Sequence, residues 1–235
     1  MSIAPAVFQF DDRNQCLDAL IGALSVATKH AIETKGFANI ALSGGSTPEP
    51  AYTKFANEDF DWSKVTIALV DERWVDVNDD ASNEKMIRRA FANAKGVKIV
   101  GMKTDDATPQ EAALKLDDIY KKLRPFDAII LGMGPDAHTA SWFSGANGLD
   151  EILNENCAQN IAPIDASHSE IGGKYPLRLT MTLPPIVETQ MLLGLIFGQD
   201  KLEVLEHCVT GDARSMPIKA AIDAARHGLA FFWAP

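Results

Sequence analysis

The sequence has few cysteines and no metal-binding signature, and each absence excludes a class of protein. Its three cysteines, Cys16, Cys157 and Cys208, are far apart and form no C-x-x-C pair. This spacing argues against a disulfide framework and a cysteine-rich zinc site, and it is typical of a protein in a reducing cytosol. No two histidines have the H-x-x-x-H or H-E-x-x-H spacing, so we expect no catalytic metal.

The sequence also lacks a long apolar run and an excess of positive charge. No uninterrupted apolar stretch approaches the ~20 residues that cross a membrane, and the N-terminus has no basic segment before an apolar core. We therefore expect a cytoplasmic protein without a membrane partner. The net charge of −10 makes nucleic acid an unexpected partner, because binding phosphate backbones needs a basic face. A small anion can still bind where a few Arg and Lys side chains converge.

Segments typical of strands and helices alternate along all 235 residues, of which 46% are hydrophobic. The alternation predicts one α/β domain, residues 1–235, with a mostly parallel twisted sheet and helices on both faces, a three-layer, Rossmann-like arrangement. The predicted strands are 7–10, 39–42, 65–70, 97–100, 128–131, 178–182, 191–197 and 229–233. Helices are expected after Asp12, after Pro48, and at about 83–94, 108–123, 200–208 and 216–225. Residues 145–169 are expected to form a loop-rich insertion.

A carboxylate and a histidine follow the predicted strand 128–131. Two glycines and a proline end the strand, and Asp136 and His138 come next. Ligands bind at the carboxyl edge of open α/β sheets, and a histidine beside a carboxylate there can act as a general base. Alternatively, His138 only caps a helical turn that begins at Thr139. These residues alone do not decide between the two interpretations.

A glycine-rich turn joins the predicted strand 39–42 to the next helix and reads Ser43, Gly44, Gly45, Ser46, Thr47, Pro48. The glycines permit close backbone approach, the hydroxyls can donate hydrogen bonds, and backbone N–H groups at the start of a helix bind anions. The turn therefore favours a phosphate-binding loop over an ordinary capped turn. It lacks the Gly-Lys-Ser/Thr ending of a Walker A loop, which disfavours a nucleoside triphosphate.

The other motifs in the sequence are weaker. Arg73, at the end of Asp71-Glu72-Arg73, can clamp a phosphate or stabilise an oxyanion, although a salt-bridged loop is the alternative. The G-x-G-x-x-A pattern at 132–137 lacks the acidic residue expected about 20 positions later in a dinucleotide-binding fold. His168 lies in a polar segment that indicates a solvated loop, and no G-x-S-x-G motif is present.

Together, these segments resemble the 6-phosphogluconolactonase family, within the larger group that includes glucosamine-6-phosphate deaminases. The matching segments, in family order, are 42–48, 71–75 with Ser82-Asn83, 131–141, 178–184 and 198–201. The resemblance implies hydrolysis of 6-phosphogluconolactone in the pentose phosphate pathway without metal or organic cofactor. It also implies that His138 activates water beside Asp136, that the 43–47 loop holds the phosphosugar lactone, and that Arg73, Arg178 and Lys201 are its cationic contacts. We expect the protein to be a monomer or a homodimer.

Two positions depart from the family pattern. Ala137 stands where the family usually has glycine, and if its backbone needs a positive φ, alanine costs roughly 1 kcal/mol there. Trp142 replaces a leucine, and we expect it to reshape the wall of the pocket.

The sequence argues against two other functions. An aminosugar-phosphate deaminase is disfavoured because the Phe-Asn-Glu-Pro continuation of those enzymes, with its glutamate, is missing after Ala140. A sugar-phosphate sensor without catalysis is disfavoured because the candidate base His138 remains.

Overall fold

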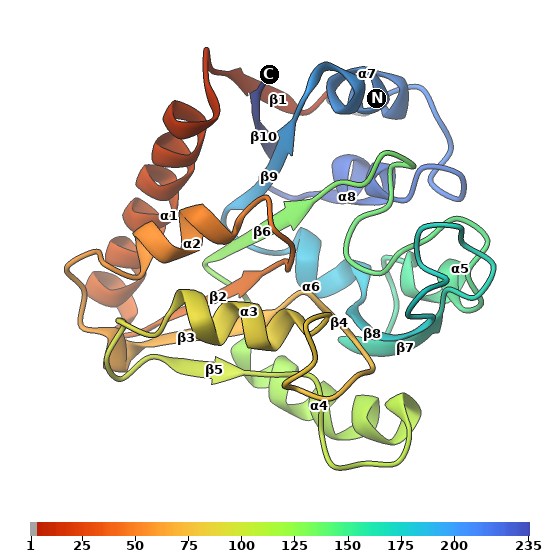
Figure 1. Cartoon of the computed structure of the whole chain (residues 1–235), viewed down its shortest axis with the longest axis horizontal. Coiled ribbons are helices and arrows are strands. Elements are labelled where there is room, and N and C mark those ends of the chain that lie inside the picture. Colours follow the sequence, from red (N-terminus) through yellow and green to blue (C-terminus); the bar gives the residue numbers. More distant parts are fainter. Residues whose placement is uncertain (1–3) are drawn as a thin grey trace.

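The computed structural model describes residues 4–235 and arranges them around a seven-stranded parallel sheet (Figure 1). The strand order is β1-β10-β9-β6-β2-β3-β5. The bounds are β1 Ala6–Gln9, β2 Ala38–Leu42, β3 Val65–Leu69, β5 Lys98–Val100, β6 Ala128–Gly132, β9 Leu192–Phe197 and β10 Leu229–Ala234. Residues 1–3, which begin the N-terminal segment considered above, lie outside the described part.

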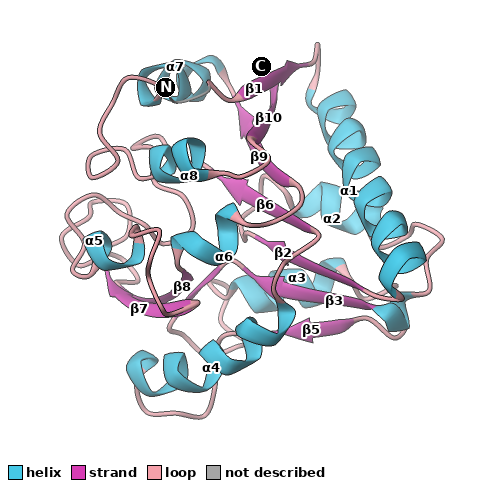
Figure 2. Cartoon of the chain, turned by 180° about the vertical axis from the view of Figure 1, so that it is seen from behind, coloured by secondary structure: helices cyan, strands magenta, loops and turns pink. Residues whose placement is uncertain are grey.

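Helices cover both faces of this sheet. On one face lie α1 Arg13–Lys35, α2 Glu49–Phe55 and α3 Asn83–Ala90 (Figure 1). The view from behind shows α4 Pro109–Leu123, α6 Leu183–Val187 and α8 Ile218–Ala224 on the other (Figure 2). The remaining helices are α5 Leu149–Ile152 and α7 Gln199–Cys208. The arrangement confirms the predicted α/β fold. None of the helices within residues 4–235 is long and apolar enough to cross a bilayer.

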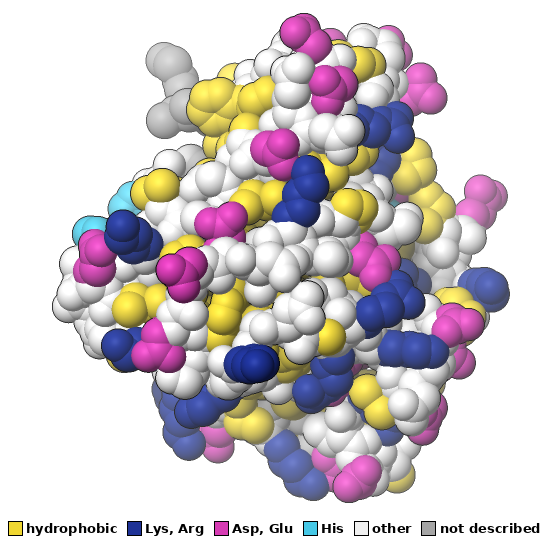
Figure 3. All heavy atoms as spheres, turned by 60° about the vertical axis from the view of Figure 1, so that its left-hand side comes forward, with side chains coloured by type: hydrophobic (Ala, Val, Ile, Leu, Met, Phe, Trp, Pro, Cys, Tyr) yellow, Lys and Arg dark blue, Asp and Glu magenta, His cyan; other side chains and the backbone are white. Residues whose placement is uncertain are grey.

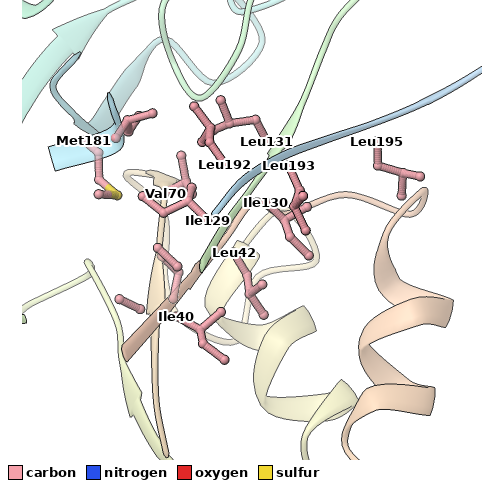
Figure 4. Packing of buried hydrophobic residues seen from close by; sticks show 14 of the residues in the cluster. Ile40, Leu42, Val70, Ile129, Ile130, Leu131, Met181, Leu192, Leu193 and Leu195 are labelled. Atoms are coloured by element: carbon pink, nitrogen blue, oxygen red, sulfur yellow. The ribbon is translucent and has the colours of Figure 1, made fainter. Parts of the chain in front are cut away.

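The central strands are apolar throughout because both faces of the sheet are covered. Ile40, Leu42 and Ile130 extend toward the helices on one side, while Ile129 and Leu131 point to the other, as strand geometry requires (Figure 4). All five side chains are at most 1% exposed. This packing holds β2 and β6 rigidly, and the loops that follow these two strands carry the candidate site.

The predicted helix boundaries are confirmed where a capping signal is present. Asp12 accepts a hydrogen bond from the N–H of Gln15 at 3.0 Å, and Gly36 ends α1 with φ 85°. Thr108 caps α4 in the same way. Where no signal exists the prediction was less accurate: the helix expected over 83–94 ends at Ala90, and α6 was not predicted.

A second sheet was not expected. Three antiparallel strands, β4 Asp71–Arg73, β8 Leu177–Met181 and β7 Ile161–Asp165, form it in the order β4-β8-β7. The strand predicted over 178–182 therefore lies outside the main sheet. The expected loop over 145–169 contains α5 and β7. Pro163 argues against a strand in the sequence, because proline is tolerated only in an edge strand, and β7 is an edge strand.

Candidate active site

The candidate site lies at the carboxyl edge of the main sheet, where the strand order reverses. After β2, the next strands of the sheet, β3 and β5, lie on one side of β2. The later strands β6, β9 and β10 lie on its other side. Such a switch point leaves a crevice in which α/β proteins bind ligands. The crevice here is a cavity of about 290 Å³, lined by residues that include Gly44, Gly45, Thr47, Arg73, His138, Arg178 and Lys201.

His138 and Asp136 form a hydrogen-bonded pair at this cavity. Nδ1 of His138 lies 2.5 Å from Oδ1 of Asp136, which leaves Nε2 as the ring nitrogen available to a ligand. Burial alone would raise the pKa of Asp136, but the hydrogen bond and charge of His138 outweigh burial and lower it. An ionised Asp136 keeps the proton of neutral His138 on Nδ1, and Nε2 can then accept one.

The loop that carries the pair is tightly wound. The N–H of Gly134 donates to the carbonyl oxygen of His138 at 2.9 Å, and a Cβ on Gly134 would lie 2.1 Å from Nδ1 of the ring. Ala137 has φ 61° and Ala140 has φ 50°, so both alanines adopt the left-handed conformation. The positive φ considered for Ala137 is therefore present, at a cost of roughly 1 kcal/mol. Two strained residues flank the histidine.

One alternative and one expectation for this loop are wrong. No helix begins at Thr139, which instead forms an isolated bridge with Trp142, so His138 is not a helix cap. Trp142 is fully buried, its Nε1 donates to the carbonyl oxygen of Met181 at 2.8 Å, and it does not line the cavity. The Trp142 side chain packs in the core and forms no part of the cavity wall.

The three residues of β4 point to different partners. Asp71 accepts a hydrogen bond from the hydroxyl of Ser141 at 2.6 Å, which ties β4 to the histidine loop. Arg73 faces the cavity and donates from Nη1 to Oδ1 of Asn83 at 2.7 Å. Within residues 4–235, none of the three residues forms an ion pair, so the salt-bridged alternative is wrong.

Glu72, 1% exposed, holds the start of α3 in place. Its carboxylate accepts from the N–H groups of Asn83 and Glu84, each at 2.8 Å, and from the hydroxyl of Ser82 at 3.0 Å. Burial raises the pKa of Glu72, and the backbone hydrogen bonds oppose that shift. A carboxylate from a neighbouring strand thus caps the helix.

We expect Glu72→Ala to destabilise the protein by about 3 kcal/mol, because several buried N–H groups lose their acceptor. Urea unfolding should show this as a lower midpoint, with the melting temperature falling by about 10 °C. Glu111→Ala is the control, because Glu111 is exposed and accepts from backbone N–H only at the surface of α4. Equal stability of the two variants would contradict the capping role.

Positive charge converges on the cavity. The β4–β8 register pairs Arg73 with Arg178, and Lys201 in the first turn of α7 completes the set. Burial lowers the pKa of both Arg178 and Lys201. In the described part of the chain, no carboxylate lies within salt-bridge distance of these three cations. On the face shown in Figure 3, by contrast, Lys and Arg lie among Asp and Glu. The three cations at the cavity can therefore attract an anion.

The glycine-rich turn supplies backbone donors more than hydroxyls. The N–H groups of residues 44–47 have no acceptor among residues 4–235. Ser43 lines the cavity, but its hydroxyl donates to the carbonyl oxygen of Ile130 at 2.9 Å and so joins β2 to β6. Ser46 is exposed and does not line the cavity, which leaves Thr47 as the hydroxyl of the turn that does so without a protein partner.

Two residues without a predicted role complete the surroundings. Asn83 donates from Nδ2 to the carbonyl oxygen of Asp71 at 2.9 Å, and a Cβ on Gly44 would lie 1.9 Å from its Oδ1. Asn83 therefore connects Arg73 to the glycine-rich turn. The sequence signal that could have indicated Asn83 is its position directly after Ser82, the N-cap of α3. Phe143 packs against His138, and no local pattern indicates that contact.

A metal site is not formed by the described residues, in which no three His, Cys, Asp or Glu side chains gather closely enough to hold an ion. His168 is exposed in the connection from β7 to β8. The chain also does not enter a helix directly after 132–137, unlike a dinucleotide-binding turn.

Comparison with known proteins gives a consistent result. A family model described as glucosamine-6-phosphate isomerases/6-phosphogluconolactonase matches residues 11–232. A 6-phosphogluconolactonase of Mesorhizobium japonicum is 34% identical over 229 residues, covering 96% of this chain and 94% of the relative. A 6-phosphogluconolactonase of Rhizobium meliloti is 33% identical, and the match covers 96% of this chain and 97% of the relative. The crystal structure of a 6-phosphogluconolactonase from Shewanella baltica superposes with a TM-score of 0.89 at 28% identity, covering 100% of both chains.

Proposed function

Because the chain belongs to the glucosamine-6-phosphate isomerase/6-phosphogluconolactonase family, we infer that it is a carboxylic ester hydrolase that opens 6-phosphogluconolactone to 6-phosphogluconate, a reaction of the pentose phosphate pathway. The observation that carries this inference is the His138–Asp136 pair at the same cavity as three cations without carboxylate partners. A base next to an anion site fits a substrate that has an ester to hydrolyse and a phosphate to bind.

His138 is the proposed general base. With its Nδ1 proton donated to Asp136, Nε2 takes a proton from a water molecule as that water attacks the lactone carbonyl carbon. The tetrahedral intermediate then breaks the bond from carbon to the ring oxygen, and His138 returns the proton to the departing oxygen. The products are a hydroxyl and a carboxylic acid on one open chain, and near neutral pH the acid releases its proton to solvent and becomes a carboxylate. A lactone is an activated acyl group, so the mechanism needs no covalent intermediate.

Arg178 is the proposed stabiliser of the oxyanion. Its guanidinium is fixed by hydrogen bonds from Nε to the carbonyl oxygen of Tyr175 at 2.9 Å and from Nη2 to that of Gly172 at 3.4 Å. A donor that is already oriented stabilises developing negative charge without reorganisation. Arg73, its partner in the β4–β8 register, extends the same positive wall.

The phosphate is proposed to bind the glycine-rich turn and Lys201. The turn offers the N–H groups of residues 44–47, and Lys201 offers an ammonium group that makes no hydrogen bond or ion pair to any residue in 4–235. A bound dianion would offset the burial that lowers the pKa of Lys201. Binding energy from this remote phosphate orients the lactone ring at His138.

The direct test is proton release from 6-phosphogluconolactone near neutral pH, corrected for spontaneous hydrolysis in buffer. We expect the purified protein to accelerate release and to leave glucosamine 6-phosphate unchanged. A rate equal to that of buffer would refute the proposed function. Release of ammonia from glucosamine 6-phosphate would instead assign the chain to the deaminase branch of the family.

We expect Lys201→Met to raise KM for the lactone by about 30-fold, because a charge-assisted hydrogen bond contributes about 2 kcal/mol. The kcat value should change little, since the phosphate contact is the same in substrate and transition state. Lys115→Met, which removes an exposed lysine of α4 outside the cavity, should leave both constants unchanged. A drop in kcat without a rise in KM would place Lys201 at the reacting carbonyl instead.

A further inference from the structure

Phe143 lies behind the candidate base, outside the cavity but in contact with two residues that line it. Its ring centroid is 4.5 Å from that of the His138 imidazole, with 31° between the planes. The Arg178 guanidinium carbon is 4.9 Å from the same centroid. Phe143 is 1% exposed and does not line the cavity. One phenyl ring therefore touches both the proposed base and the proposed oxyanion stabiliser.

The ring is itself held firmly. A Cβ on Gly172 would lie 3.4 Å from Cε2 of Phe143, so the connection from β7 to β8 packs directly against the ring. The same connection supplies the two carbonyl oxygens that fix Arg178. Phe143 thus packs against the connection that fixes Arg178, and its ring contacts both Arg178 and His138.

The contacts have a physical role because the face of an aromatic ring is negative. It attracts the guanidinium, and it also attracts an imidazolium, which His138 becomes when it takes the proton from water. Asp136 fixes the imidazole through one side-chain hydrogen bond, about which a ring can still tilt. Contact with a buried aromatic ring removes that freedom.

We propose that Phe143 is a positioning residue that holds His138 and Arg178 in a single arrangement, so that base and oxyanion stabiliser meet the lactone together. This inference rests on the proposed lactonase function. It goes beyond that function by making one core side chain responsible for the relative placement of His138, on the loop after β6, and Arg178, on strand β8.

The test compares Phe143→Leu with Phe126→Leu. Phe126 is also fully buried, but the centroid of its ring lies 6.2 Å from that of Tyr120, and Phe126 does not line the cavity. Phe143→Leu should lower kcat about tenfold and raise KM several-fold, since two aromatic contacts are lost. Phe126→Leu should leave both constants unchanged while lowering the melting temperature. Kinetics of Phe143→Leu that match those of Phe126→Leu would overturn the proposal.

A second measurement needs no substrate. The hydrogen-bonded Nδ1 proton of His138 should give a low-field proton NMR signal in the free protein, which Phe143→Leu broadens and Phe126→Leu retains. The signal reports on the histidine even if the lactone is not hydrolysed, so failure of the proposed function and failure of this inference are distinguishable. A sharp, unshifted signal in Phe143→Leu would count against positioning.

If Phe143→Leu does not fold, replacing Phe143 with phenylalanine analogues of nearly the same shape still tests the proposal. Progressively fluorinated phenylalanines at position 143 keep the shape of the ring and weaken the negative charge of its face. We expect kcat/KM to fall stepwise with fluorination. Unchanged kcat/KM across the series would show that the ring only fills space, and the proposal would fail.

Discussion

His138→Gln is expected to lower kcat for lactone hydrolysis by about a thousandfold, because general base catalysis contributes about 10²–10⁴-fold. Glutamine can still donate to Asp136, so the loop and the cavity remain intact, but it cannot take a proton from water. KM should stay within a few-fold of the unmodified protein, since the phosphate contacts are untouched. Steady-state proton-release kinetics measure both constants.

His168→Gln is the matched control for this change. His168 is exposed in the connection from β7 to β8 and does not line the cavity, so the same substitution there should leave kcat unchanged. Binding of 6-phosphogluconate, measured by calorimetry, should persist in His138→Gln. An undiminished kcat in His138→Gln would exclude His138 as the base and with it the proposed mechanism.

The sequence predicts this site well where the signals are local. Strand 128–131 ends in turn-forming residues, and the side chains after it must emerge at the carboxyl edge of a parallel sheet. The turn at 43–48 follows another strand of that sheet. Because β2 and β6 are neighbours in the structure, the two loops meet at one cavity.

The sequence does not predict the second sheet, because its pairing is long-range. Arg73 and Arg178 lie opposite each other although more than 100 positions separate them. A short apolar run shows that a strand is possible but not which distant strand it pairs with. The convergence of two arginines on one wall was therefore visible only in the structure.

Side-chain contacts were the least predictable part of the site. Ser43 was expected to bind the ligand, but its hydroxyl donates to β6. Trp142 was expected at the pocket wall, and it fills the core. Such outcomes depend on which atoms surround a side chain after folding, and sequence pattern carries little information about that. For the same reason, no sequence pattern indicates the contacts of Phe143 with His138 and Arg178.

Gly134→Ala is expected to lower kcat almost as far as His138→Gln, by several hundredfold, because it displaces the base and with it most of the ~10²–10⁴-fold that a general base contributes. The added Cβ would lie 2.1 Å from Nδ1 and 2.2 Å from Cε1 of His138, and 2.7 Å from Oδ1 of Asp136. Contacts under 3.0 Å are essentially never seen for a real Cβ, so the imidazole must move away. Its hydrogen bond to Asp136 then breaks, and Nε2 loses its orientation.

The effect of Gly134→Ala can be separated from general damage to the fold. Gly134 does not have a positive φ, so alanine adds steric conflict without backbone strain. Gly22→Ala adds the same methyl group to α1, where nothing lies within 4 Å, and should leave kcat unchanged. Overpacking at position 134 should also cost about 1–3 kcal/mol of stability, which urea unfolding measures.

A double-mutant cycle decides whether Gly134 acts through His138. If the alanine works only by displacing the imidazole, it has nothing left to disturb once the base is gone. The double variant Gly134→Ala/His138→Gln should then hydrolyse the lactone about as fast as His138→Gln alone, because two changes that remove one function are not additive. If instead the loss of kcat in the double variant equals the product of the two single losses, Gly134 acts for a separate reason, such as the approach of the substrate to the loop backbone.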